Sequence, residues 1–254
     1  MDFAVSFSPE IEAFRQEVFA ERAKLPAYAY PDMGVPDTEE RPPAATQAPA
    51  AAPSVNSAFP RWKATNVLGQ KQPGYSVVTV RLRLGDISAR QLRALAGIVR
   101  RYCGGYLRAS IEQNLVLRWV RHEHLAALFS ELAPVGLAEA EANRLQDVTS
   151  CPGAETCQLG ISASRGLARA LEARLKEAKL SGEDVDSVRI KVSGCPNSCG
   201  QHHIADIGFF GGAKKVNDHL TPHFQLMLGG MTEEGKAQFG QPILKLPARR
   251  IPDA

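Results

Sequence analysis

The 254-residue sequence predicts an α+β fold in which a split β-α-β, ferredoxin-like unit precedes an α/β domain. Three observations carry this prediction. Residues 61–136 read as a strand, a helix, two paired strands and a second helix. Residues 137–254 alternate between helical and strand-like periodicity. Four of the five cysteines lie in two short loops of that second segment, at boundaries between expected elements.

The first 60 residues stand apart from this folded part. Residues 9–24 are expected to form a helix, with Ser8 as its N-cap and Pro9 in its first turn. One side of this helix carries an apolar stripe of Ile11, Phe14, Val18 and Phe19. We therefore assign residues 1–25 to an N-terminal helix. Residues 26–60 hold nearly half of the 17 prolines and are assigned to a linker.

The ferredoxin-like unit is expected to begin near Trp62. Residues 75–84 alternate between apolar and polar side chains, which predicts a half-buried strand. Ser88 is expected to cap a helix that runs to about Arg101 and ends at Gly104. The buried side of that helix is expected to carry Leu92, Leu95, Ala96 and Val99. Two strands and a helix complete the unit: residues 106–110, 114–120 and 122–132.

The α/β domain is expected to contain one long helix and several strands. The helix is predicted over residues 159–180, directly after the first cysteine loop, so its N-terminal N–H groups would point at the loop. Glycine pairs at 211–212 and 229–230 are expected to end two of the strands. The strands themselves are predicted at residues 187–192, 204–210 and 224–228.

The two cysteine loops have C-x5-C and C-x3-C spacing, Cys151 to Cys157 and Cys195 to Cys199. Brought together, they supply four thiolates, one for each iron of a cubane cluster. A structural zinc site is an alternative, although its spacers usually have two to four residues. A disulfide framework would need an oxidising compartment, and buried structural cysteines rarely sit in Cys-Pro loops beside glycine. Cys103 is expected to be a small buried apolar residue.

Composition limits the partners and the compartment. The net charge is +3 without a polybasic run, so a nucleic-acid partner is not expected. No apolar run reaches the length of a membrane span, and the N-terminus lacks the pattern of a secretory signal. Reduced cysteines in a protein without a signal indicate the cytoplasm.

The segments Cys151-Pro-Gly-Ala-Glu-Thr-Cys157 and Gly194-Cys-Pro-Asn-Ser-Cys-Gly200 together resemble the cofactor site of the sirohaem-dependent nitrite and sulfite reductases. The resemblance covers roughly residues 61–230. It implies a ferredoxin-like half-domain over 61–136 and a sirohaem/[4Fe-4S]-binding domain over 137–254. It further implies a [4Fe-4S] cluster and sirohaem as cofactors. The implied cluster ligands are Cys151, Cys157, Cys195 and Cys199, and Cys199 would bridge the cluster to the sirohaem iron.

The segment Arg108-Ala-Ser-Ile-Glu-Gln-Asn114 resembles the sirohaem-facing turn in the second half of these enzymes. Arg108 is expected to pair with a carboxylate of the macrocycle, and Gln113 and Asn114 to donate hydrogen bonds. Asn197 is expected to shape the second cysteine loop against the macrocycle. Without the resemblance, Arg108 reads as a surface charge and Asn114 as a turn residue. Four further residues near the loops are assigned no ligand role: His202, His203, Lys214 and Lys215.

The resemblance implies six-electron reduction of sulfite to sulfide or of nitrite to ammonia, with electrons from ferredoxin or a reductase subunit. The chain matches the second half of such enzymes, and the anion-binding Arg and Lys residues are expected in the first half, so no catalytic residue is assigned. We expect a partial enzyme, or else a homodimer of halves. The alternatives are an iron–sulfur electron-transfer module without sirohaem, a cobalamin-pathway oxygenase of the same fold, and a zinc-binding structural protein.

Overall fold

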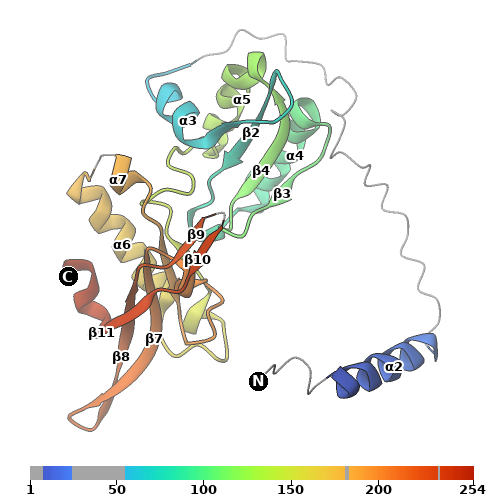
Figure 1. Cartoon of the computed structure of the whole chain (residues 1–254). Coiled ribbons are helices and arrows are strands. Elements are labelled where there is room, and N and C mark those ends of the chain that lie inside the picture. Colours follow the sequence, from blue (N-terminus) through green and yellow to red (C-terminus); the bar gives the residue numbers. More distant parts are fainter. Residues whose placement is uncertain (1–7, 25–54, 181–182, 234) are drawn as a thin grey trace. The chain divides into compact units, whose positions relative to one another are not determined.

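The computed structural model describes residues 8–24, 55–180, 183–233 and 235–254. Two compact units, residues 1–41 and 42–254, are considered separately. In the first unit, α2 (Ser8–Lys24) confirms the predicted N-terminal helix (Figure 1). Most of the predicted linker lies outside the described residues. Within the described part of the chain, no helix is long and apolar enough to cross a membrane.

The second unit begins with a four-stranded antiparallel sheet and three helices (Figure 1). The strand order is β1-β2-β4-β3, and each strand runs antiparallel to its neighbour. The helices are α3 (Phe59–Asn66), α4 (Ala89–Cys103) and α5 (Leu125–Leu132). The strands are β1 (Val67–Gly69), β2 (Tyr75–Val80), β3 (Arg108–Ala109) and β4 (Leu115–Arg121). The predicted succession of elements is present, and α3 starts the unit three residues before Trp62.

Helix α4 begins and ends as its sequence predicts. The Ser88 hydroxyl accepts the Gln91 N–H over 3.2 Å, and the Gln91 side chain accepts the Ser88 N–H over 3.0 Å, which makes a capping box. The helix ends at Gly104, whose φ of 69° is left-handed. Leu92 was expected to face inward and is instead 47% exposed. The buried side of the helix instead includes Leu95, Ile98, Val99 and Tyr102.

The strand predicted over residues 75–84 ends early, at Val80. A 3₁₀ turn follows over Arg83–Gly85, with Leu84 in the left-handed region at φ 53°. This turn passes the chain from one core to the next, because Leu82 packs in the first core and Leu84 in the second. The alternation of apolar and polar residues does not predict this turn, because Leu82 and Leu84 would also be buried in a continuous strand.

The second half of the unit is a mixed five-stranded sheet in the order β11-β8-β7-β6-β5. Strands β5, β6 and β7 are parallel, and β7, β8 and β11 are antiparallel. The helices are α6 (Ser164–Ala178) and α7 (Glu183–Asp186). The sheet strands are β5 (Thr149–Ser150), β6 (Ile190–Ser193), β7 (Ile207–Val216), β8 (His219–Leu228) and β11 (Gln241–Pro247). A separate hairpin pairs β9 (Met231–Glu233) with β10 (Lys236–Gln238).

Two predictions for this half need correction. Helix α6 begins at Ser164 and not at residue 159, because a loop separates it from Cys157. The glycine pair 211–212 does not end a strand, because β7 continues through it and pairs Gly211 with Phe224. Gly211 lies against the backbone of Gly194, where a side chain would collide. Short 3₁₀ helices complete the unit: His122–His124, Ala133–Val135, Gly153–Glu155, His202–Ile204 and Ala248–Asp253.

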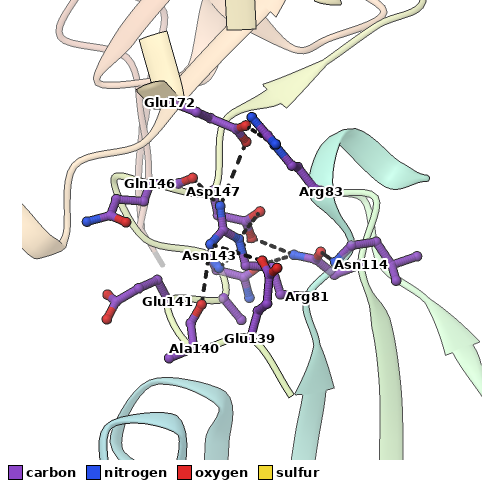
Figure 2. Close-up of polar contacts among 12 residues, drawn as sticks. Arg81, Arg83, Asn114, Glu139, Ala140, Glu141, Asn143, Gln146, Asp147 and Glu172 are labelled. Atoms are coloured by element: carbon purple, nitrogen blue, oxygen red, sulfur yellow. Dashed lines mark hydrogen bonds and ion pairs between the residues drawn. The ribbon is translucent and has the colours of Figure 1, made fainter. Parts of the chain in front are cut away.

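A buried polar network joins the two halves of the unit (Figure 2). Arg81, with its side chain 9% exposed, lies 3.1 Å from Asp147, measured between Nε and Oδ1. Its guanidinium also donates to the backbone carbonyls of Ala140 and Gln146. Because buried charges need both a counter-ion and hydrogen bonds, this set holds the segment 139–147 against β2.

Glu172 brings α6 into the same network (Figure 2). Arg83 Nε donates to Glu172 Oε2 over 2.6 Å, and Arg81 lies 3.7 Å from Glu172 Oε1. Burial raises the pKa of Glu172, and the neighbouring arginines oppose that rise. The half-domain and the cysteine-bearing domain therefore share charged partners across their boundary.

Candidate metal centre

The two cysteine loops start at neighbouring strand ends. Strands β5 and β6 are parallel, with Ser150 opposite Val192, so both strands end at the same edge of the sheet. Cys151 follows β5 directly, and its N–H donates to the Val192 carbonyl over 3.1 Å. Cys195 follows two residues after β6. The crossover through α6 therefore brings together cysteines that are far apart in the sequence.

Glycines allow the two loops to pack backbone against backbone. A side chain on Gly194 would lie 2.6 Å from the Gly153 Cα in the other loop. Within the first loop, a side chain on Gly160 would lie 2.6 Å from the Ala154 nitrogen. The Gly194 carbonyl accepts the N–H groups of Ile161 and Ser162 over 3.0 and 2.9 Å. The first loop is therefore fixed directly on the second.

The sulfur of Cys151 accepts a backbone hydrogen bond from the second loop. The Gly194 N–H donates to Cys151 Sγ over 3.1 Å. Ser164 Oγ lies 3.5 Å from the same sulfur and donates to the Cys151 carbonyl over 2.7 Å. Since Ser164 is the first residue of α6, a helix N-terminus does meet the loop, though at Cys151 and not after Cys157 as predicted. An N–H donor and a helix N-terminus therefore lie beside a sulfur of the first loop.

All four loop cysteines are free thiols, with Cys151 and Cys195 buried and Cys157 and Cys199 exposed. No group of three or more His, Cys, Asp or Glu side chains in the described ranges could hold a single metal ion. A cubane cluster makes a different demand, one thiolate on each of four irons. Free thiols, N–H donation to sulfur and the glycine packing fit such a cluster.

The fifth cysteine is separate from this site. Cys103 is 2% exposed in the core of the ferredoxin-like half, as expected for an apolar residue. Burial raises the pKa of its thiol to about 12. Its sulfur contacts the Val99 carbonyl at 3.3 Å, the bond of a protonated thiol to its own helix.

The loop that follows Cys199 is tied to β6. Ser198 and Gln201 both have left-handed backbone, with φ of 59° and 60°, a strained conformation for residues other than glycine. Ser193 Oγ accepts the Gly200 N–H over 3.1 Å and lies 2.8 Å from His202 Nδ1. These contacts hold the loop in its strained form.

His202, to which the sequence assigned no ligand role, is fully buried. Burial, with a contribution from His203, lowers its pKa to about 4, and the imidazole is therefore neutral at pH 7. Its Nε2 has no hydrogen-bond partner within the described residues. His203 packs on it with ring centroids 4.1 Å apart.

The turn between β3 and β4 reaches the first cysteine loop. Gln113, with a left-handed φ of 67°, donates from Nε2 to the Ser150 carbonyl over 2.9 Å, one residue before Cys151. Its Oε1 is buried without a partner in the described part of the chain. Arg108 lies exposed on β3 at the start of the same turn. Gln113 therefore contacts the chain next to Cys151, and its predicted donation to the macrocycle stays a prediction.

Asn114 is placed differently from its prediction. It is 1% exposed, and its two amide hydrogens are donated to Asn143 and Asp147 over 3.0 and 2.7 Å. Its Oδ1 accepts the Leu82 N–H over 2.8 Å. With both side-chain donors used inside the chain (Figure 2), Asn114 supports the turn, and donation to a macrocycle would require it to rearrange.

Asn197 lies exposed at the tip of the second loop, between Cys195 and Cys199. Lys214 and Lys215 are exposed far along β7, and they remain without a role at this centre.

One residue at the centre was not anticipated. Lys191 is 2% exposed on β6, and the signal that could have identified it is a lysine inside a strand that is otherwise buried.

Comparison with known proteins agrees with this geometry. Residues 68–135 match the nitrite/sulfite reductase ferredoxin-like half domain, and residues 141–248 match the nitrite and sulphite reductase 4Fe-4S domain. The predicted ferredoxin-like half-domain and cluster-binding domain are both confirmed as family domains. The family's cofactors, a [4Fe-4S] cluster and sirohaem, are those that the resemblance implied.

Individual relatives are longer than this chain. The chain is 36% identical over 177 residues to the chloroplastic ferredoxin–nitrite reductase of Zea mays. The aligned region covers 67% of this chain and 30% of that protein. The chain is 29% identical over 176 residues to the ferredoxin–nitrite reductase of Synechococcus elongatus, covering 66% of this chain and 33% of that protein. It thus spans about a third of each relative.

A solved structure gives the same result. The NirA protein of Mycobacterium tuberculosis superimposes with a TM-score of 0.63 at 26% identity, covering 81% of this chain and 37% of NirA. Both family domains follow one another here in a single folded unit, with the cysteine loops at the sheet edge. The chain belongs to the family of nitrite and sulfite reductases that use sirohaem and a [4Fe-4S] cluster.

Proposed function

We propose that this chain is the cluster-bearing half of an enzyme that reduces nitrite to ammonia or sulfite to sulfide with six electrons. The observation that carries the proposal is the meeting of the two cysteine loops at the ends of β5 and β6, inside the segment that matches the 4Fe-4S domain. The named relatives are ferredoxin–nitrite reductases, which supports nitrite as the substrate and ferredoxin as the electron donor.

The four loop cysteines are the proposed cluster ligands, Cys151, Cys157, Cys195 and Cys199. Within this proposal Cys199 would help to hold both the cluster and sirohaem. The bound cofactors supply electrons one at a time and an open iron position for the substrate anion. The need for four thiolates also supports a reducing compartment, and we propose the cytoplasm.

The chain's own residues prepare this site for a negatively charged cluster. Gly194 donates its N–H to the Cys151 sulfur, and the start of α6 adds the positive end of a helix dipole. Arg108, exposed on β3, is proposed to hold a carboxylate of the macrocycle through its planar guanidinium. Asn197, exposed between two ligands, is proposed to shape the loop against the same group.

The test is anaerobic purification of the full chain from cells that make extra sirohaem. An absorbance spectrum is recorded together with iron and acid-labile sulfide analysis. About four non-haem irons per chain and a Soret band would support the proposal, since that is the stoichiometry of one cubane beside a macrocycle. One zinc without sulfide would overturn it.

A cluster without a Soret band would favour an iron–sulfur electron-transfer module. One observation supports that alternative: one half domain and one 4Fe-4S domain match, and the aligned region covers only about a third of the named relatives. The oligomeric state of the loaded protein separates a homodimer of halves from a single half that needs another chain.

Matched cysteine variants test the ligand assignment. Cys199→Ser should remove the spectral coupling between cluster and macrocycle and lower the iron content. Cys103→Ser, in the other core, should leave both unchanged. A Cys199→Ser protein with normal coupled spectra would contradict the bridging role.

A further inference from the structure

A lysine that no part of the proposed function uses is buried beside the cysteine loops. Lys191 is 2% exposed, and Ser193, two residues along β6, is 1% exposed. Ile190 and Val192, which alternate with them, pack in the core formed with α6. Lys191 and Ser193 therefore lie on the opposite face of β6, and that face carries polar groups. A lysine is rarely buried unless it is paired.

The partners of Lys191 come from two different segments. Its Nζ donates to Gln201 Oε1 over 3.0 Å, and Gln201 is two residues after Cys199. The same Nζ lies 4.0 Å from Glu112 Oε1, in the turn between β3 and β4. Both partners offer oxygen acceptors, as the ammonium form requires. Burial lowers the pKa of Lys191, and the Glu112 carboxylate opposes that change.

Both segments bonded to Lys191 also contact the cysteine loops in other ways. Gln201 has a left-handed backbone conformation. Ser193 Oγ accepts the N–H of the neighbouring Gly200. Gln113, the neighbour of Glu112, donates to the Ser150 carbonyl just before Cys151. The turn at 110–114 is therefore fixed to the first loop by Gln113 and to the second by Glu112 through Lys191.

We infer that Lys191 is a positioning residue that locks the Cys199 loop to the turn at 110–114 and places a fixed positive charge beside the cluster site. The contacts of Lys191 restrain the Cys199 loop and the turn at 110–114 whether or not cofactors are bound. The charge acts on the cluster, because a buried cation stabilises the more negative, reduced state and so raises the reduction potential. The second effect rests on the proposed function, and the first does not.

The lock is tested on the cofactor-free full chain by amide hydrogen exchange. Lys191→Met keeps the length of the side-chain stem and removes the ammonium. Amides 200–202 should then exchange about tenfold faster, since a hydrogen bond to a charged group is lost. Glu112→Gln should speed exchange in residues 110–114 alone. Lys214→Met, on an exposed stretch of β7, should change neither. Unchanged exchange in both Lys191→Met and Glu112→Gln would overturn the lock.

The charge is tested on the loaded protein by an electron-paramagnetic-resonance redox titration. Lys191→Met should lower the cluster's reduction potential, and Lys191→Arg should restore it toward the wild-type value, which a purely structural role would not do. Equal potentials in wild type and Lys191→Met would overturn the charge effect. If the wild type binds no cluster, the proposed function fails while hydrogen exchange still decides the lock. Wild-type circular dichroism in each variant ensures that folded proteins are compared.

Discussion

Gly194 donates its backbone N–H to the sulfur of Cys151 across the two loops, over 3.1 Å. The donor belongs to the segment that carries Cys195, and the acceptor belongs to the segment that carries Cys157. This hydrogen bond thus contributes both to the packing of the loops and to the electrostatic environment of a proposed ligand.

Gly194→Ala should separate the loops, because the new methyl group would meet the Gly153 Cα at 2.6 Å. Overpacking of this kind costs about 1–3 kcal/mol of the free energy of unfolding. We expect less iron and sulfide per chain after anaerobic purification and a lower urea midpoint for the apoprotein. Gly212→Ala is the matched control, since nothing lies within 4 Å of its Cβ position. Equal iron contents in the two variants would contradict the packing argument.

Arg81→Met should destabilise the whole second unit, because Asp147, 5% exposed, would lose its buried counter-ion. Breaking a buried pair from one side costs about 3–5 kcal/mol. Urea unfolding followed by tryptophan fluorescence measures the change. Arg174→Met provides the surface comparison, since the Arg174 side chain is 55% exposed beside Glu177 and such pairs contribute about 0–1 kcal/mol. Similar losses in both variants would show that the network of Figure 2 does not stabilise the fold.

Thiol labelling of the apoprotein should separate the cysteines by exposure and pKa. At pH 8 iodoacetamide should modify Cys157 and Cys199 quickly, since both are exposed. Cys103 should stay unmodified until the protein unfolds, because burial raises its pKa to about 12 and leaves almost no thiolate. Mass spectrometry of the peptides gives the rate for each site. Rapid modification of Cys103 in folded protein would place it outside the core.

Apoprotein stability should fall as the pH is lowered from about 6.5 to 4. His202 has an ordinary pKa of 6.5 when unfolded and about 4 when folded, so acid protonates the unfolded chain first. Its contribution is therefore fully present above pH 6.5 and lost toward pH 4, by roughly 3 kcal/mol.

His202→Gln should flatten that part of the pH profile, whereas His219→Gln, at an exposed position in β8, should leave it steep. Denaturant midpoints at half-unit pH steps provide the measurement. A profile that stays steep in His202→Gln would assign the acid sensitivity to other groups.

Most elements of the fold could be predicted from short sequence patterns. The Ser88 cap, the Gly104 stop and the spacing of the cysteine loops act over a few residues, so they can be read without knowing the tertiary structure. The burial of Leu128 and Phe129 follows from helical periodicity in the same way.

What escaped prediction depends on contacts between distant segments. Gly211 was predicted to end a strand. It lies within β7 instead, where the absence of a side chain allows close approach of the Gly194 backbone. Asn114 looked like a cofactor ligand, but Asn143 and Asp147 take both of its donors. Lys191 is paired with residues 79 positions before it and 10 after it, which no local pattern could indicate.

The parallel arrangement of β5 and β6 sets an order of events in the making of the protein. Cys151 and Gly194 cannot meet until α6 has crossed over and packed, because that helix links the two strands. A growing chain therefore exposes the first two thiols well before it acquires the last two. All four proposed ligands are present only after Cys199 has been synthesised, so a cluster that uses all four can be completed only after that point.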